Sequence, residues 1–304
     1  MPRMDTDVDP PAGLTARPAT HEDARSVFEL VAAHESAVQG RPDIAFQDIL
    51  ADWRRPSFDL ATDSIVVFDG ERMVAAAEVF KGRRAEAMVH PDAWDRGIGA
   101  WLLGWTERCA RRAGGALVGQ TVQDTLVAAV ELLRRRGYEP LWTSWILEIT
   151  LAERPPEPEL PRGFAFRPYV AGDDRAIFEV IERAFSEWPD RDASSFEDWH
   201  ASTIQGEEFD PELLLLIEHE GEPVGVALCI DAVDDGWVQT LAVAREHRGA
   251  GLGRALLQRA FVEFHRRGRS VVQLGTDSRA GALGLYEHVG MRVVRSYTHY
   301  AKDL

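Results

Sequence analysis

Cysteine, long apolar runs and positive charge are all scarce in this sequence, and each shortage excludes a class of protein. The 304 residues include two cysteines, Cys109 and Cys229, in different halves of the chain. A disulfide framework or a zinc site is therefore not expected, and a reducing cytoplasm is the predicted location. No apolar run reaches about 18 residues, so neither a membrane span nor a membrane partner is predicted. The nine histidines lack the spacing of metal-binding motifs, so no metal is expected.

The charge balance is acidic, with 34 basic against 50 acidic residues and a formal net charge of −16. Nucleic-acid binding modules carry a basic surface, so no nucleic-acid partner is predicted. An acidic surface helps to collect a cationic amine, but plain solubility is the favoured explanation. Residues 1–12 are acidic and have no apolar core. We expect a disordered lead-in there, and neither a signal peptide nor a transit peptide.

Two copies of one pattern fill the rest of the chain. Residues 13–18 read Gly-Leu-Thr-Ala-Arg-Pro, and residues 163–168 read Gly-Phe-Ala-Phe-Arg-Pro. Residues 89–103 likewise match residues 243–257, and both stretches contain a Gly-x-Gly turn. The offset between matching residues stays between 150 and 154. We therefore predict an N-terminal domain at 13–152, a proline-rich linker at 153–162 and a C-terminal domain at 163–304.

The second copy has the coarse pattern of a mixed α/β fold. Apolar runs near Leu213–Ile217, Val224–Ile230 and Trp237–Val243 are separated by short turns that contain glycine. Such spacing is typical of an antiparallel meander. A helical pattern follows, and then a short buried strand at Val271–Leu274. We predict the α/β class, with a mixed, largely antiparallel central sheet flanked by helices in each copy.

A glycine-rich turn at residues 248–253, Arg-Gly-Ala-Gly-Leu-Gly, joins the last of these runs to the helical pattern. A strand, a glycine turn and a helix N-terminus form a cradle for a diphosphate, because glycine lets the backbone approach and the first helical N–H groups lack partners. The dinucleotide fingerprint has a different glycine spacing, and the P-loop needs a Lys-Ser or Lys-Thr pair that does not follow here. A turn that merely tightens the connection is the remaining alternative.

Two motifs in the second copy resemble those of the GNAT acyltransferase family. The acyl-CoA signature of that family is Gln or Arg, two residues, Gly, one residue, then Gly or Ala, and Arg248, Gly251 and Gly253 fill it. Further on, the family commonly shows Asn-x-x-Ala-x-x-Leu-Tyr and a Gly-hydrophobic pair. Residues 279–286 read Arg-Ala-Gly-Ala-Leu-Gly-Leu-Tyr, and Gly290-Met291 follows. The resemblance implies two tandem GNAT-type domains and an acyltransferase that uses acetyl-CoA as co-substrate.

The resemblance also implies roles for individual residues. Backbone groups at the end of a splayed strand would align the pantetheine arm, the glycine turn would hold the diphosphate, and a tyrosine would protonate the departing thiolate. Arg279 stands where the family often has the asparagine that contacts the pantetheine. The predicted cofactor-binding residues are Leu241, Ala242, Val243, Arg248, Gly249, Ala250, Gly251, Leu252, Gly253, Arg254 and Arg279, and the predicted catalytic residue is Tyr286.

The implied mechanism is direct transfer, in which a neutral amine attacks the thioester of a bound acyl-CoA and CoA leaves as the thiolate. The N–H of Val243 is a plausible oxyanion donor. Some family members carry a glutamate base eleven residues before the signature Gln or Arg, but Trp237 stands there in this chain. Other carboxylates are candidates by neighbourhood alone, and none is favoured over a water relay. These are Asp231, Asp234, Glu187 and Glu246.

The two copies differ where the chemistry is expected. Trp94 stands in the first copy at the position of Arg248, with Arg96 two residues further on, and Leu133 stands at the position of Tyr286. A leucine cannot donate a proton, so we interpret the first copy as a degenerate GNAT domain and the second as catalytic.

A two-copy layout with one weakened copy also resembles the mycothiol synthases, which acetylate the cysteinyl amine of a small thiol. The leading hypothesis is therefore an N-acetyltransferase acting on a small-molecule amine. A non-catalytic acyl-CoA-binding regulator and an acetyltransferase acting on a protein amine remain as alternatives. Either a monomer or a homodimer is compatible with the sequence.

Overall fold

The computed structural model describes residues 9–186, 195–206, 209–231 and 235–304. Its chain forms two compact units: unit 1 comprises residues 1–142 and 297–304, and unit 2 comprises residues 143–296. Residues 1–8 of the predicted lead-in lie outside the described part. Within the described ranges, no helix combines the length and the apolar character needed to cross a membrane.

Unit 1 is a mixed α/β structure whose sheet has the order β1-β2-β3-β4-β5-β12. All of these neighbours pair antiparallel except β4 and β5, which pair parallel. The strands begin and end at Leu14–Arg17 (β1), Ser64–Asp69 (β2), Arg72–Phe80 (β3), Arg84–Val89 (β4), Leu117–Gln123 (β5) and Arg292–Asp303 (β12). The helices are η1 (His21–Asp23), α1 (Ala24–Gln39), α2 (Phe46–Trp53), α3 (Leu60–Asp63), η2 (Pro91–Ala93), α4 (Ile98–Arg112) and α5 (Val127–Arg135).

Unit 2 repeats this plan with the sheet order β6-β11-β10-β9-β8-β7, in which only β10 and β11 pair parallel. Its strands are β6 (Glu139–Thr150), β7 (Phe164–Arg167), β8 (Leu214–His219), β9 (Glu222–Asp231), β10 (Gly236–Val243) and β11 (Val271–Asp277). Its helices are α6 (Asp174–Phe185), α7 (Phe196–Ser202), η3 (Pro211–Leu213), η4 (Arg245–His247), α8 (Leu252–Arg266) and α9 (Leu283–His288). The predicted α/β class and the antiparallel meander of β8, β9 and β10 are confirmed.

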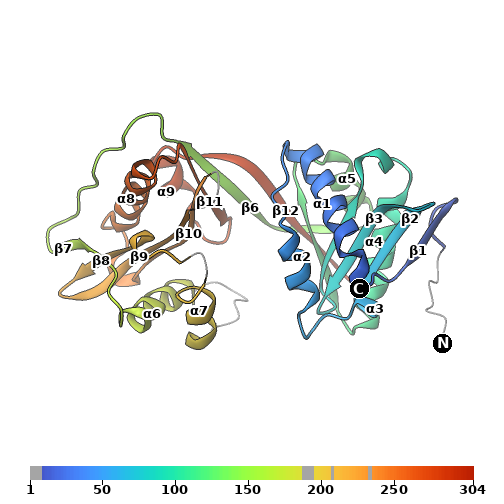
Figure 1. Ribbon diagram of the computed structural model, residues 1–304, viewed down its shortest axis with the longest axis horizontal. Coiled ribbons are helices and arrows are strands. Elements are labelled where there is room, and N and C mark those ends of the chain that lie inside the picture. The colour runs from blue at the N-terminus through green and yellow to red at the C-terminus, as the bar shows by residue number, and fades with distance from the viewer. Residues whose placement is uncertain (1–8, 187–194, 207–208, 232–234) are drawn as a thin grey trace. The chain divides into compact units, whose positions relative to one another are not determined.

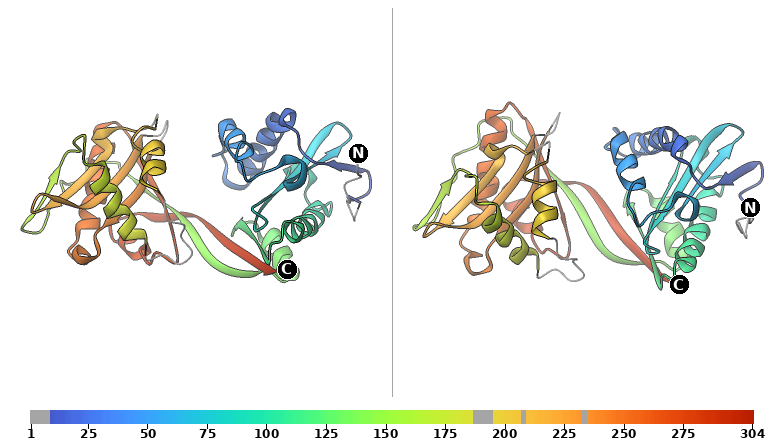
Figure 2. Two further views of the ribbon diagram at one scale, coloured as in Figure 1. Left: turned by 90° about the horizontal axis from the view of Figure 1, so that it is seen from below. Right: turned by 60° about the horizontal axis from the view of Figure 1, so that its bottom comes forward.

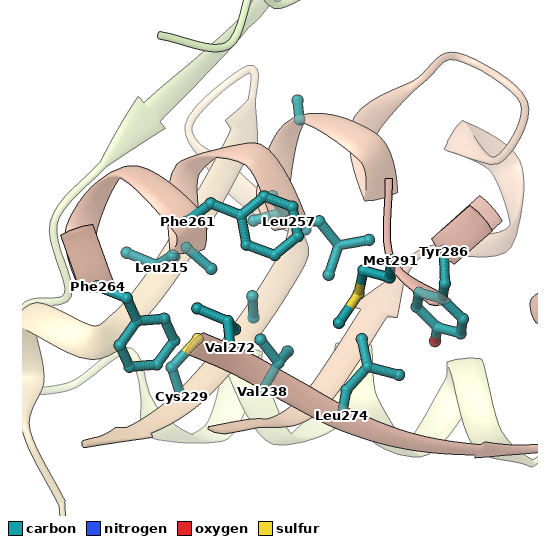
Figure 3. Packing of buried hydrophobic residues seen from close by; sticks show 14 of the residues in the cluster. Leu215, Cys229, Val238, Leu257, Phe261, Phe264, Val272, Leu274, Tyr286 and Met291 are labelled. Carbon is teal, nitrogen blue, oxygen red and sulfur yellow. The ribbon is translucent and has the colours of Figure 1, made fainter. Parts of the chain in front are cut away.

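Helices cover both faces of each sheet. In unit 2, α8 and α9 lie on one face and α6 and α7 on the other (Figure 1). The α8 face is filled by a core cluster that includes Leu256, Phe261 and Phe264 from the apolar stripe of α8. Figure 3 shows Phe261 and Phe264 of α8 packed over strand residues such as Val238 and Val272. A separate cluster on the other face joins Ile177 and Ile181 of α6 to the strands.

The last strand of each sequence copy pairs inside the other unit. Residues 144–150 of β6 end the first copy in sequence but pair with β11, from Ser144 opposite Asp277 to Thr150 opposite Val271. Residues 297–303 of β12 end the second copy but pair antiparallel with β5. Figures 1 and 2 accordingly place the C-terminus in unit 1. The compact units therefore differ from the sequence copies by two exchanged strands.

The exchange predicts that a substitution near the C-terminus destabilises unit 1. Tyr300 of β12 is 2% exposed and belongs to the core under α4. Tyr300→Ala should lower the free energy of unfolding by about 3–5 kcal/mol, the usual cost of truncating a buried aromatic side chain. Hydrogen exchange measured strand by strand should show lost protection in β2 to β5. Val294→Ala, on the same strand at an exposed position, is the control, and loss of protection in β8 and β9 instead would contradict the assignment.

Candidate active site

Strands β10 and β11 separate partway along their length. They pair only from Gly236 opposite Val272 to Val238 opposite Leu274. Beyond this point β10 keeps its partner β9, after a bulge at Gln239, as far as Val243 opposite Gly225. Strand β11 meanwhile keeps β6 as its partner as far as Asp277. An opening between the two strands therefore begins at residues 240 and 275.

The open edge of β10 presents the backbone of alternate residues. The N–H of Ala244 donates to Val224 O of β9 at 2.8 Å, and successive residues of a strand direct their backbone groups to opposite sides. Ala242 therefore faces β9, whereas Leu241 and Val243 direct their backbone groups to the opening. Of the three residues predicted to align a pantetheine arm, two have their polar backbone atoms on the open side.

The predicted diphosphate loop has the backbone geometry that its glycines allow. Gly249 and Gly251 have φ values of +79° and +85°, a region that side chains other than glycine rarely occupy. Helix α8 begins at Leu252, and its first internal bond runs from Ala255 N–H to Gly251 O at 3.0 Å. Across the described ranges no acceptor bonds the N–H groups of residues 249–254. The loop therefore offers a row of open amides at a helix N-terminus, where the dipole favours an anion.

Two arginines of this loop have different surroundings. Arg248 donates from Nε to Val243 O at 3.2 Å and from Nη2 to Ala184 O at 3.1 Å. Arg254 is exposed in the first turn of α8. Its side chain has no ion pair or hydrogen bond within the described part of the chain. A cation at a helix N-terminus opposes the helix dipole, so Arg254 is placed where a bound anion relieves an unfavourable interaction.

Tyr286 lies where its hydroxyl can reach the opening. It is 7% exposed on α9 and belongs to the α8 core cluster. Figure 3 shows it at one end of that cluster, with its oxygen directed toward the strand that carries Leu274. Burial raises the pKa of the Tyr286 phenol, and a hydrogen bond with Thr276 of β11 acts in the opposite direction. The phenol is therefore protonated at neutral pH, as an acid must be.

Arg279 is occupied by a neighbouring carboxylate. Its guanidinium contacts Asp277 Oδ2, with Nε at 3.1 Å, and its N–H donates to Asp277 Oδ1 at 2.9 Å. Burial raises the pKa of Asp277, but these bonds outweigh it and hold the pKa below its usual value. The pair shapes the turn between β11 and α9, so Arg279 differs in its surroundings from the asparagine that the family often has here.

The structure describes two of the four carboxylates named as general-base candidates, Asp231 and Glu246. Asp231 is paired with Arg269, whose Nε lies 2.6 Å from Asp231 Oδ1, and Glu246 is exposed in η4. Glu187 and Asp234 lie outside the described residues. Trp237 takes the place of the family's glutamate, and a Cβ added to Gly275 would lie 3.9 Å from its ring. No cluster of His, Cys, Asp or Glu in the described ranges could hold a metal ion.

Unit 1 has the same opening with different side chains around it. Strands β4 and β5 pair only at Arg84 and Ala85, so β4 also leaves its parallel neighbour. Trp94 donates to Val89 O at 3.0 Å, and Arg96 is paired with Asp69 at 2.8 Å. Asp95, at a φ of +62°, occupies the position of Gly249. Its carboxylate places a negative charge in the loop where an anion would bind.

Three differences between the copies were not predicted from the sequence, although Gly249 and Arg254 themselves were predicted as cofactor-binding residues. Thr276 has Val122 as its counterpart, Gly249 has Asp95 and Arg254 has Ala100. Aligning the two copies residue by residue identifies each difference. The signal for Thr276 is that its hydroxyl and that of Tyr286 disappear together in the first copy, where Val122 and Leu133 stand.

Comparison with known proteins finds one family. The Acetyltransferase (GNAT) family matches residues 175–291. A mycothiol acetyltransferase of Kineococcus radiotolerans is 30% identical over 96% of this chain and 97% of its own. Another, of Thermobispora bispora, is 30% identical over 74% of this chain and 79% of its own.

Solved structures show the same relationship. A GCN5-related N-acetyltransferase from Sphaerobacter thermophilus has a TM-score of 0.80 and 33% identity, with 97% of this chain and 96% of that chain covered. A tandem GNAT protein from the clavulanic acid biosynthesis pathway shares the fold, with a TM-score of 0.71 and 17% identity over 95% of this chain and 98% of that one.

The environment of Tyr286 predicts its titration. The difference in ultraviolet absorbance between the wild type and Tyr286→Phe should show a phenol that ionises above pH 10, because burial disfavours the phenolate. Thr276→Val removes the hydroxyl that favours the phenolate, so it should raise this pKa further. A Tyr286 phenol that ionises below pH 10 in the wild type would contradict its burial.

Proposed function

Because the chain belongs to the GNAT family of acetyltransferases, we propose that it moves an acetyl group from acetyl-CoA to the primary amine of a small molecule. The reaction is assigned to the C-terminal sequence domain, residues 163–304. The N-terminal domain, residues 13–152, is proposed to be degenerate and to be joined to it by the linker at 153–162.

The loop before α8 supports binding of the CoA diphosphate. Its open amides at residues 249–254 are donors at the positive end of a helix, which suits a diphosphate. The side chain of Arg254 adds a positive charge beside them. Leu252 and Leu256 are 1% and 0% exposed, so the core holds the start of α8 rigidly and the amides are preorganised for the anion.

The opening between β10 and β11 supports placement of the thioester. The backbone groups of Leu241 and the N–H of Val243 face it and can align the pantetheine arm, whereas Val243 O accepts from Arg248. The N–H of Val243 is then available to the thioester oxygen, where it would stabilise the negative charge that develops during attack. Tyr286 is protonated and buried on the α8 side. It is assigned the role of the acid that donates a proton to the leaving thiolate. Holding both substrates in this arrangement contributes much of the rate by proximity.

The contrast between the two loops is the observation that carries the assignment to the second domain. The residues at matching positions are Gly249, Arg254 and Tyr286 in the second copy and Asp95, Ala100 and Leu133 in the first. The residues of the second copy offer space, a positive charge and a proton donor to an acyl-CoA. Those of the first copy include a negative charge and no proton donor. Both openings exist, so the difference lies in the side chains.

The relatives support a small-molecule acceptor. They are named mycothiol acetyltransferases, and the cysteinyl amine of a small thiol is therefore the first acceptor to test. None of the described carboxylates is assigned as a base, so the amine is proposed to enter as the neutral form or to lose its proton through water.

Acetyl transfer can be tested directly with acetyl-CoA and a panel of amines. The panel should contain cysteinyl-glucosamine, other small primary amines, and peptides with a free lysine or N-terminus, with the acetylated product measured by mass spectrometry. We expect turnover with the small amines. Tyr286→Phe should lower kcat by about 10²–10⁴-fold, the range for general acid catalysis, while leaving acetyl-CoA affinity nearly unchanged. Turnover with the peptides alone would indicate a protein acceptor, and binding without turnover of any amine would indicate a regulator.

The loop contrast predicts one acetyl-CoA bound per chain by calorimetry. Gly249→Asp copies the first loop into the second and should weaken this binding at least about tenfold, since like charges about 4 Å apart repel by roughly 1–4 kcal/mol near a surface. Gly249→Asn is the matched control, because asparagine has the same shape, tolerates positive φ and carries no charge. Two sites per chain, or equal losses in both variants, would contradict the proposal.

A further inference from the structure

The guanidinium of Arg248 links two elements of unit 2. Its Nε lies 3.2 Å from Val243 O at the end of β10, and its Nη2 lies 3.1 Å from Ala184 O in the last turn of α6. The planar guanidinium holds donors in a fixed fork, so one side chain can bond two carbonyls at once. Both acceptors belong to the protein backbone.

The bond to Ala184 completes the C-terminal end of α6. The last carbonyls of a helix have no partner within it. In α6 the carbonyl of Glu182 accepts from Ser186 N–H at 2.8 Å, and that of Arg183 accepts from Ser186 Oγ at 3.0 Å. Arg248 serves the next carbonyl in line, and its positive charge suits the negative end of the helix dipole. Arg248 therefore acts as a capping residue supplied from another element.

Unit 1 has a counterpart of only one of the two bonds that Arg248 makes, the one to the strand carbonyl. Helix α1 continues to Gln39, so the carbonyl of His34, the counterpart of Ala184, lies inside a helix and is already used. Val89 O, the counterpart of Val243 O, accepts from Trp94 at 3.0 Å and lies 3.1 Å from His34 Nδ1. The degenerate copy thus retains a tie between strand and helix, but without an arginine and without a helix cap.

The two core clusters of unit 2 indicate which side of the opening between β10 and β11 helix α6 borders. The diphosphate loop leads into α8, and Tyr286 belongs to the core cluster on the α8 side. Val180, Ala184 and Ala242 belong to the cluster on the opposite side. A thioester in the opening would have its leaving group next to Tyr286, so the amine has to approach from the α6 side.

Resting on the proposed function, we infer that Arg248 is a positioning residue for the amine acceptor and not a ligand of the CoA diphosphate. It fixes the end of α6 against the open edge of β10, which makes one wall of the acceptor side. The positive charge that faces the diphosphate belongs to Arg254.

Two substitutions at nearby positions separate these roles. Acetyl-CoA affinity by calorimetry, KM for acetyl-CoA and for cysteinyl-glucosamine, and amide exchange in residues 180–186 should be measured for each. Arg248→Ala should leave acetyl-CoA affinity within about threefold, raise the KM for the amine about tenfold and speed exchange at the end of α6 about tenfold, as expected for losing charge-assisted bonds. Arg254→Ala should weaken acetyl-CoA binding several-fold and leave α6 exchange unchanged.

Arg248→Lys is the deciding control. Lysine keeps the charge but has a single ammonium on a flexible stem, so it should restore neither the amine KM nor the slow exchange. A tenfold loss of acetyl-CoA affinity in Arg248→Ala that Arg248→Lys restores would overturn the inference and identify a phosphate ligand. Unchanged exchange and unchanged amine KM in Arg248→Ala would also overturn it. If the wild type turns over no amine, the proposed function fails, whereas the affinity and exchange measurements still decide whether Arg248 holds α6 or the diphosphate.

Discussion

The early end of pairing between β10 and β11 is the constraint on which the rest of the site depends. Three residues of each strand are paired, and beyond them each strand keeps only the partner on its other edge, β9 for β10 and β6 for β11. Backbone groups inside a protein are normally satisfied by a ladder, so the free edge at Leu241 and at the N–H of Val243 is a costly feature unless a ligand covers it. Val243 O already accepts from Arg248. Because β9 holds the other edge of β10 and the core holds α8, the opening cannot close by simple collapse.

The two sequence copies keep this opening and differ in the side chains around it. Both have a strand that leaves its parallel neighbour, a positive-φ loop and a helix that starts at the same place. The first copy has Asp95 and Ala100 where the second has Gly249 and Arg254. The two copies can therefore share a backbone while their loop side chains differ, since the fold depends on core residues such as Leu102 and Leu256, which are both 0% exposed.

Strand exchange makes the two units depend on each other's sequence. Strand β6 is encoded at the end of the first copy and completes the sheet of unit 2, while β12 is encoded at the end of the second and completes that of unit 1. Leu147 of β6 is fully buried in the core that also contains Tyr286. Residues of the first copy thus support the α9 region of the second.

The sequence by itself determined the α/β class, the meander of unit 2, the repeat and the GNAT family, because these follow from apolar periodicity, turn residues and motif spacing along a continuous chain. The site residues remain predictions, and their surroundings were decided by the tertiary structure. No local pattern indicates that Arg248 reaches Ala184, that Arg279 is held by Asp277 or that Thr276 meets Tyr286. Only the folded chain shows which strand pairs in which unit, since the partner of a long strand is selected by packing between segments far apart in sequence.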